Sequence, residues 1–370
     1  MTTIDASRVL GPSGWTGPAR VHLQGAAILA VEPLPGVTGE AAHRSLVPGF
    51  VDLQVNGIDD IDVATAEGGD WEVLDRRLAA QGVTAWCPTL VSMPLDRYAA
   101  PLTRIARARE RAPRARPLLV GVHLEGPFLG GAPGAHRRSN VVPVDLDWLH
   151  ALPSGVAIVT LGAEQPLAEE ATRRLSERGI VVAIGHSTAD ADEFHGVVAA
   201  GARLVTHLFN GMSGLHHREP GVAAFALAPD PGTPAPFASL IADGVHVDLR
   251  MLRLAFTLLG ERAVLVSDAV GWRAGSLGPV DIELRDGAPR LADGTLAGSA
   301  LTVDGALRVC VAAGVPLEQA CWAASTTPAR LLGLPCAAGV VSGAPADLVA
   351  LDDRLHVTET WISGTPVLAD

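Results

Sequence analysis

The clearest pattern in the chain is a regular alternation of short apolar runs with amphipathic segments. The apolar runs suit buried parallel strands, and they end near Asn56, Val91, Glu125, Leu161, His186, His207, Asp243 and Asp268. Helix-like stretches follow most of them, at residues 71–81, 95–111, 165–178, 191–200 and 249–259. Eight strands with intervening helices predict an α/β fold with a (β/α)8 TIM barrel. The alternative, a doubly wound open sheet, lacks a G-x-G-x-x-G motif after an early strand.

Both ends of the chain show a different pattern, with short β-like runs broken by glycine and proline. These runs include residues 19–23 and 26–31 near the N-terminus, and 346–352 and 357–367 near the C-terminus. We therefore expect one small β domain built from both termini, over residues 1–45 and 340–370. The barrel is expected over residues 46–339.

Polar side chains that can bind metals or transfer protons stand at the ends of six apolar runs. In a barrel all strand C-termini meet at one face, where active sites form. A buried polar group without a partner costs about 1–3 kcal/mol, so the side chains are expected to share one site. They are Asp52, Gln54, Asn56, His123, Glu125, His186, His207, Asp243, His246 and Asp268.

Glu125, His186 and His207 supply one carboxylate and two imidazoles. This is the ligand set of an open catalytic zinc site, in which the metal polarises a carbonyl and acidifies a water. Asp268, after the last strand, is then free to take a proton from that water. The alternative for Asp268 is a helix N-cap.

Two further residues, His136 and Arg218, lie with His246 in loops at the same face. His136, in a glycine-rich loop, could donate a hydrogen bond to an oxyanion or could be a plain surface histidine. Arg218 and His246 follow the sixth and seventh strands, and a planar guanidinium suits a phosphate. The alternative for Arg218 is a surface ion pair with Glu219.

Composition narrows the class of partner. The net charge of −12 disfavours a nucleic acid or an anionic membrane, but it permits a small anionic substrate held by local charges. All 28 basic residues are arginine, which excludes a Schiff-base lysine, a P-loop lysine and a carboxylated lysine bridging two metals. Cys87, Cys310, Cys321 and Cys336 are scattered and form no C-x-x-C pair. Without an export signal or an apolar stretch of the ~20 residues that a membrane span needs, we expect a cytoplasmic protein.

At these residues the chain resembles the amidohydrolase superfamily and, within it, the N-acetylglucosamine-6-phosphate deacetylases. The resemblance runs in order over nearly the whole chain. Its motifs are PGFVDLQVNG at 48–57, HLEGPF at 123–128, GHS at 185–187, THLFN at 206–210, REPG at 218–221, IADGVHVD at 241–248, SDA at 267–269 and GTLAGSALT at 294–302.

The resemblance implies a barrel with a small β-sandwich, and hydrolysis of an N-acetyl amino sugar phosphate to acetate and the free amine. It implies that Glu125, His186 and His207 bind the metal, that Asp268 is the general acid and base, and that His136 polarises the acetyl carbonyl. Arg218 and His246 would bind phosphate, with Arg218 reaching the neighbouring subunit of a homodimer. The sugar pocket would be lined by Ala135, Asn210, Gly211, Leu296, Ala297 and Gly298.

One divalent metal per subunit is expected. Many amidohydrolases carry His-x-His after the first strand for a second metal, whereas this chain has Gln54 and Asn56, as in the single-metal branch of the family. Amide side chains are poor ligands for zinc or iron. Zinc is the first expectation for this one site, and ferrous iron also suits its ligands.

Two other functions remain open. A related hydrolase could act on N-acetylgalactosamine 6-phosphate or on another N-acyl amine. A non-enzymatic sugar-phosphate sensor would have no use for a base such as Asp268 beside a metal. The segments 129–134 and 270–275 match no pattern of the family, and both border the expected site.

Overall fold

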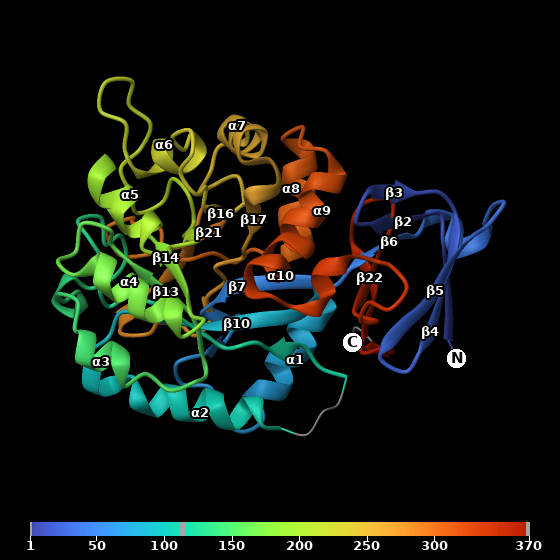
Figure 1. Ribbon diagram of the computed structural model, residues 1–370. Helices are drawn as coiled ribbons and strands as arrows, with labels where there is room; N and C mark the ends of the chain where they lie inside the picture. Colours follow the sequence, from blue (N-terminus) through green and yellow to red (C-terminus); the bar gives the residue numbers. More distant parts are fainter. Residues whose placement is uncertain (1, 112–114, 368–370) are drawn as a thin grey trace.

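The larger part of the molecule is a parallel barrel (Figure 1). Eight parallel strands follow one another around it in the computed structural model, which describes residues 2–111 and 115–367. They are β7 (Phe50–Val55), β10 (Val83–Val91), β12 (Val122–Glu125), β13 (Val156–Leu161), β14 (Val181–Ile184), β15 (Leu204–Val205), β16 (Phe237–Leu240) and β17 (Ala263–Leu265). A bridge between Val55 and Ala269 closes the barrel. The predicted TIM barrel is confirmed.

The barrel strands are buried on both faces. Every residue of β7 and β10 is buried, including the polar Asp52 and Gln54. Alternate positions on the strands, such as Val51 and Val181, pack with Ala329 and Leu331 of α10 (Thr326–Leu332) inside the barrel. Because this packing fills the barrel near the strand beginnings, space for a site remains at the strand ends.

Helices cover the outside of the barrel. In α7, the buried residues Leu252, Ala255, Phe256 and Leu259 repeat at helical spacing and form one apolar face. The five predicted helices are present, with bounds shifted by at most a few residues. The outer helices are α1 (Asp70–Ala80), α2 (Ala99–Arg109), α3 (Leu146–His150), α4 (Ala168–Glu177), α5 (Ala191–Ala199), α6 (Val222–Leu227), α7 (Leu249–Leu259), α8 (Val303–Ala312) and α9 (Leu317–Ala324).

Short paired strands decorate the barrel. β11 (Leu118–Leu119) extends the pairing of β10. Three small hairpins join β8 (Gly57–Ile58) to β9 (Ile61–Asp62), β18 (Ser276–Leu277) to β19 (Val280–Asp281), and β20 (Glu283–Arg285) to β21 (Ala288–Arg290), within the described residues. The last two follow the final barrel strand, and the β18–β19 hairpin lines the pocket described below.

Two further sheets form the small part of the molecule at the right of Figure 1, where both chain ends lie. One has the order β1 (Thr2–Ala6), β4 (Ala19–Gln24), β5 (Ala27–Pro33). The other has the order β24 (Thr365–Val367), β23 (Val357–Ile362), β22 (Leu348–Leu351), β6 (Ser45–Pro48), β2 (Arg8–Gly11), β3 (Gly14–Thr16). They pack over a shared core that includes Ile4, Val21, Ile28, Leu348 and Trp361. A sandwich built from both termini is therefore present, as expected.

Two further features concern the cysteines and the length of the helices. Cys87, Cys310, Cys321 and Cys336 are all buried and free. Among residues 2–111 and 115–367, none of the helices combines the length and the apolar character needed to cross a membrane.

Candidate active site

The C-terminal ends of four barrel strands bring polar side chains to one place. Glu125 is the last residue of β12, His186 and His207 each follow their strands by two residues, and Asp268 follows β17 by three. All four side chains are buried, and all line one pocket, together with His136 from the loop after β12. These five residues, which the sequence singled out for chemistry, therefore lie together.

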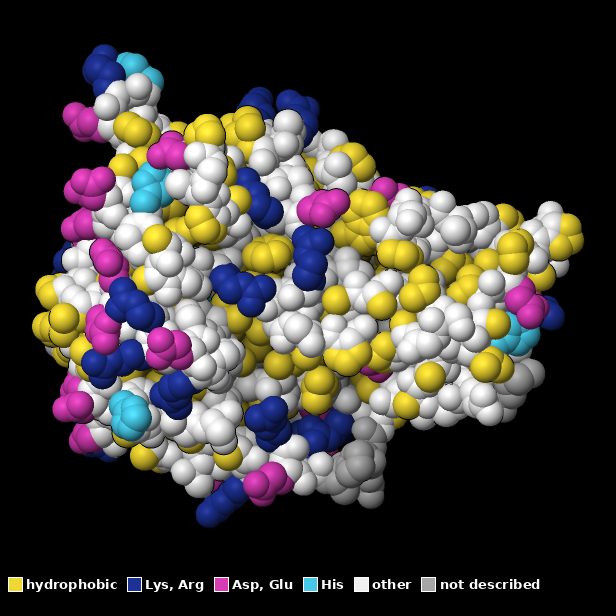
Figure 2. Space-filling model, in the orientation of Figure 1, with side chains coloured by type: hydrophobic (Ala, Val, Ile, Leu, Met, Phe, Trp, Pro, Cys, Tyr) yellow, Lys and Arg dark blue, Asp and Glu magenta, His cyan; other side chains and the backbone are white. Residues whose placement is uncertain are grey.

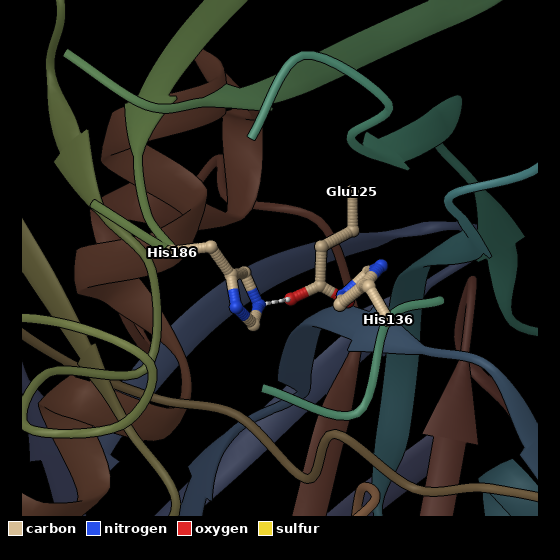
Figure 3. Close-up of side chains that lie close together, drawn as sticks. All are labelled: Glu125, His136 and His186. Atoms are coloured by element: carbon tan, nitrogen blue, oxygen red, sulfur yellow. Dashed lines mark hydrogen bonds and ion pairs between the residues drawn. The ribbon is translucent and has the colours of Figure 1, made fainter. Parts of the chain in front are cut away.

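Three potential ligand atoms converge in this pocket. Glu125 Oε1 is 3.1 Å from His186 Nε2 and 2.8 Å from His207 Nε2, and the two imidazole nitrogens are 3.1 Å apart. Glu125, His136 and His186 also form a group whose ligand atoms lie within 4.8 Å of one another (Figure 3). This buried cluster of one carboxylate and histidines could hold one metal ion.

The chemistry of the donors fits a cation. His186 Nδ1 lies 3.0 Å from the carbonyl oxygen of Ala132, to which it can only donate, so in the neutral ring Nε2 carries a lone pair. That lone pair faces the Glu125 carboxylate and the second imidazole, and such electron-rich atoms repel unless a positive charge lies among them. Although burial raises the pKa of the Glu125 carboxyl, its contacts with the His186 and His207 imidazoles hold it well below its usual value. Burial lowers the pKa of His207, but Glu125 raises it above its ordinary value.

His136 has the opposite tautomer. The backbone N–H of Ser92 donates to His136 Nδ1 at 3.3 Å, so the proton of the neutral ring sits on Nε2. Nε2 lies 3.8 Å from Glu125 Oε2, and the ring therefore presents an N–H to the site. Burial, helped by the nearby His186, lowers the pKa of His136 to about 3, which keeps the ring neutral. The side chain is only 6% exposed, so the alternative of a plain surface histidine is wrong.

Asp268 is held by two amides from β7 and the residue after it. Asn56 Nδ2 and Gln54 Nε2 donate to the same carboxylate oxygen, Oδ1, at 2.7 and 3.0 Å. The other oxygen is therefore the one that can exchange a proton in the pocket. Burial, reinforced by the Glu125 carboxylate, raises the pKa of Asp268 well above its usual value. The N-cap alternative is wrong, because the next α-helix in the described chain, α8, begins only at Val303.

The backbone at these strand ends is unusual. His186, His207 and Asp268 have backbone φ angles of 51°, 31° and 49°, in the left-handed region that residues other than glycine rarely adopt. Such conformations cost about 1–3 kcal/mol each and cluster at functional sites. The barrel therefore holds all three side chains in conformations that local preferences alone would not produce.

The pocket wall contains most of the predicted substrate contacts. Ala135, Asn210, Gly211, His246, Leu296 and Gly298 all line it. Ala297 lies between two of these residues but is buried, with its backbone N–H bonded to Pro289 O at 3.0 Å. Arg137 and the β18–β19 hairpin, through Leu277, Pro279 and Val280, also line the pocket and were not predicted from the sequence.

Arg218 lies elsewhere. It is exposed on the loop between β15 and α6, which projects from the barrel in Figure 1 and carries basic and histidine side chains at its tip in Figure 2. In the described structure its guanidinium bonds to His217 Nε2 at 2.9 Å rather than to Glu219. Arg218 is therefore not brought into its own chain's pocket, whereas His246 is, with Nδ1 held by Asp243 Oδ2 at 2.7 Å.

Sequence reasoning missed some of the residues that support the site. Ser92, which orients His136, was not predicted, and Gln54 and Asn56 were expected at the site but not as the side chains that hold Asp268. Glu164, after β13, bonds to both the loop before His136 and the segment after His186. No local pattern marks Ser92 or Glu164, because their partners lie 23 or more residues away.

A parallel barrel with a carboxylate, two histidines and a final-strand aspartate at its strand ends defines the hydrolase class of the amidohydrolase superfamily. No protein-family model matches the chain. The chain is, however, 39% identical over 339 residues to the N-acetylglucosamine-6-phosphate deacetylase of Bos taurus, covering 86% of this chain and 82% of that protein. The chain belongs to the N-acetylglucosamine-6-phosphate deacetylase family.

One further relative and one solved structure support the family and the fold. The N-acetylgalactosamine-6-phosphate deacetylase of Escherichia coli O157:H7 is 35% identical over 372 residues, which cover 97% of each chain. The solved structure of a Mycobacterium smegmatis N-acetyl-D-glucosamine-6-phosphate deacetylase variant, in complex with N-acetyl-D-glucosamine 6-phosphate, superposes with a TM-score of 0.89. It is 31% identical and covers 99% of both chains. The expected family and fold are thus confirmed.

Proposed function

We propose that the chain hydrolyses the N-acetyl group of N-acetylglucosamine 6-phosphate to give glucosamine 6-phosphate and acetate. The observation that carries this proposal is the meeting of Glu125, His186 and His207 with Asp268 in one buried pocket of a member of this deacetylase family. A sensor would gain nothing from a proton acceptor at that position.

Glu125, His186 and His207 are the proposed ligands of one divalent metal, with zinc first and ferrous iron second. This set is favoured over one containing His136, because His136 presents an N–H rather than a lone pair. When bound there, such a metal supplies Lewis acidity that polarises the acetyl carbonyl and acidifies water.

Asp268 is the proposed general base and acid. It takes a proton from the attacking water through the carboxylate oxygen that Gln54 and Asn56 leave free, and it then protonates the departing sugar nitrogen. The second transfer is needed because an amine anion is a poor leaving group. His136, through its Nε2–H, donates to the oxygen on which negative charge develops.

His246 and Arg218 are the proposed phosphate ligands. His246 lines the pocket of its own chain, while Arg218 stands on the projecting loop. An arginine so placed can serve the pocket of a neighbouring copy, so we propose a homodimer in which Arg218 is shared across the interface. Ala135, Asn210, Gly211 and the turn Leu296–Gly298 form the proposed sugar pocket.

The second candidate substrate is N-acetylgalactosamine 6-phosphate, because a relative of that activity matches almost the whole chain. The test is acetate release from N-acetylglucosamine and N-acetylgalactosamine, each with and without the 6-phosphate. We expect the highest kcat/KM for N-acetylglucosamine 6-phosphate. A preference for the galactose epimer would replace the main substrate by the second, and hydrolysis that ignores the phosphate would contradict both.

Two organisational features complete the proposal. The small β-sandwich is proposed over residues 1–45 and 340–370 and the catalytic barrel over residues 46–339, with β6 (Ser45–Pro48) extending the sandwich to Pro48; Met1 and residues 368–370 lie outside the described structure. The division is supported by the separate hydrophobic core of the sandwich.

The enzyme is proposed to work in the cytoplasm, where sugar phosphates are metabolised.

A further inference from the structure

The carboxylate of Glu164 connects two segments that carry the active site. Glu164 follows β13 by three residues, and its Oε1 accepts hydrogen bonds from the backbone N–H of Gly131 at 2.8 Å and of Thr188 at 2.6 Å. The Thr188 hydroxyl adds a bond at 3.1 Å, and the Ser187 hydroxyl donates to Oε2 at 2.5 Å. One side chain therefore joins a loop after β12 to the end of β14.

Both connected segments hold side chains of the site. Gly131 belongs to the loop that leads to His136, and Ser187 and Thr188 directly follow His186. The two segments also contact each other, since Gly130 N donates to His186 O at 2.9 Å and His186 Nδ1 bonds to Ala132 O at 3.0 Å. The bond to Ala132 is the one that fixes the His186 tautomer, so the position of this loop sets which nitrogen faces Glu125.

The loop packs directly against the Glu164 carboxylate. A Cβ at Gly130 would lie 2.1 Å from Glu164 Oε1, and a Cβ at Gly162 would lie 2.4 Å from Gly130 N. Any side chain at either position would push the loop away. Gly130, in the segment 129–134 that matches no family pattern, is thus explained by the close approach of the loop to Glu164.

The negative charge of Glu164 is matched to its partners. The Ser187 hydroxyl oxygen accepts the backbone N–H groups of Ala163 and Ala189, both at 3.3 Å, so its own proton points towards Glu164. An amide NH2 in place of Oε2 would meet this O–H with a second donor. Glutamine has the same length as glutamate but cannot make the same set of bonds.

We propose that Glu164 is a positioning residue, which holds loop 129–136 and His186 in the register that the metal site and His136 require. The inference rests on the proposed function, because it takes His186 as a metal ligand. Loss of a group that orients a metal-binding histidine typically lowers metal affinity or activity by about 10–100-fold, and we expect a loss of that order for Glu164.

The test measures zinc affinity by competition with a chelator, on purified Glu164→Gln protein without substrate. We expect the affinity to fall by about 10–100-fold, kcat at saturating zinc to fall as well, and KM for the sugar phosphate to stay close to that of the wild type. The matched control is Glu170→Gln, the same change on α4, where the carboxylate pairs with Arg173 and Arg174 on the surface. The control should keep wild-type zinc affinity and kcat.

Folded Glu164→Gln protein with wild-type zinc affinity would overturn the inference. If that variant does not fold, Thr188→Val, which removes one hydrogen bond to Glu164, takes its place, and it must lower zinc affinity in the same direction for the inference to stand. Zinc binding is measured apart from catalysis. A wild-type protein that binds zinc but releases no acetate would therefore contradict the proposed function, while the Glu164 result would still stand or fall by itself.

Discussion

At the scale of single residues, Gln54 and Asn56 decide how many metals the site holds. Both amides donate to Asp268 Oδ1, so they are engaged in holding the proposed base and offer no imidazole to a second metal. Elemental analysis of protein purified without chelator should give about one equivalent of zinc or iron per chain. Two tightly held equivalents, both needed for activity, would contradict the single-metal site.

The residues of the site were predictable from the sequence to different degrees. Glu125, His186, His207 and Asp268 stand at the ends of apolar strands, and a barrel brings all such ends together whatever its loops do. Glu164 could not be found in this way, because its role depends on the path of a loop that lies more than 30 residues away in the chain. Tautomers, such as that of His136, likewise depend on hydrogen bonds that only the folded chain makes.

At the scale of elements, the start of α5 shows how a helix is fixed next to the site. Asp190 accepts a hydrogen bond from Glu193 N, and the Glu193 side chain accepts one from Asp190 N, which forms a capping box. Asp190→Ala should lower the free energy of unfolding by about 0.5–2 kcal/mol and leave kcat unchanged, because no ligand side chain depends on the cap. Urea denaturation and acetate release measure the two quantities.

The control for this change is Asp192→Ala, an exposed acidic residue in the first turn of the same helix. It alters the charge at the helix N-terminus without removing the cap, so its effect on stability should be smaller. Equal losses from both substitutions would assign the effect to charge rather than to the capping box.

Elements with strong patterns were predictable, and short ones were not. The barrel strands end within three residues of the predicted positions, because most of the apolar runs end at a polar side chain. The β18–β19 hairpin, which lines the pocket, has strands of two residues, too short for any alternation to be visible. Helices α3 and α6, with five and six residues, span less than two turns and show no helical period.

At the scale of the whole molecule, the projecting loop with Arg218 links the substrate to the quaternary structure. A charge-assisted hydrogen bond to a phosphate contributes about 1.5–3 kcal/mol, so Arg218→Ala should raise KM for the phosphorylated substrate by roughly tenfold to a hundredfold. The unphosphorylated sugar should be affected little. Steady-state kinetics on the two substrates measure this difference, and equal impairment of both would remove Arg218 from the phosphate site.

Mixing two impaired variants, at a substrate concentration below the raised KM, tests whether Arg218 acts across the dimer. After subunit exchange, a heterodimer of Arg218→Ala and Asp268→Asn chains would contain one site with native Asp268 and with native Arg218 from the partner. Partial recovery of activity is expected. No recovery despite confirmed exchange would mean that each arginine serves its own chain.

The central claim is that Asp268, beside a single metal site, carries the proton in amide hydrolysis. The most direct test is kcat for acetate release from N-acetylglucosamine 6-phosphate by Asp268→Asn protein whose metal content equals that of the wild type. Because general acid and base catalysis contributes about 10²–10⁴ in rate, kcat should fall by at least that factor while metal and substrate still bind. If the variant kept roughly half of the wild-type kcat, the loss would be far smaller than predicted, and the proton transfer would belong to another group.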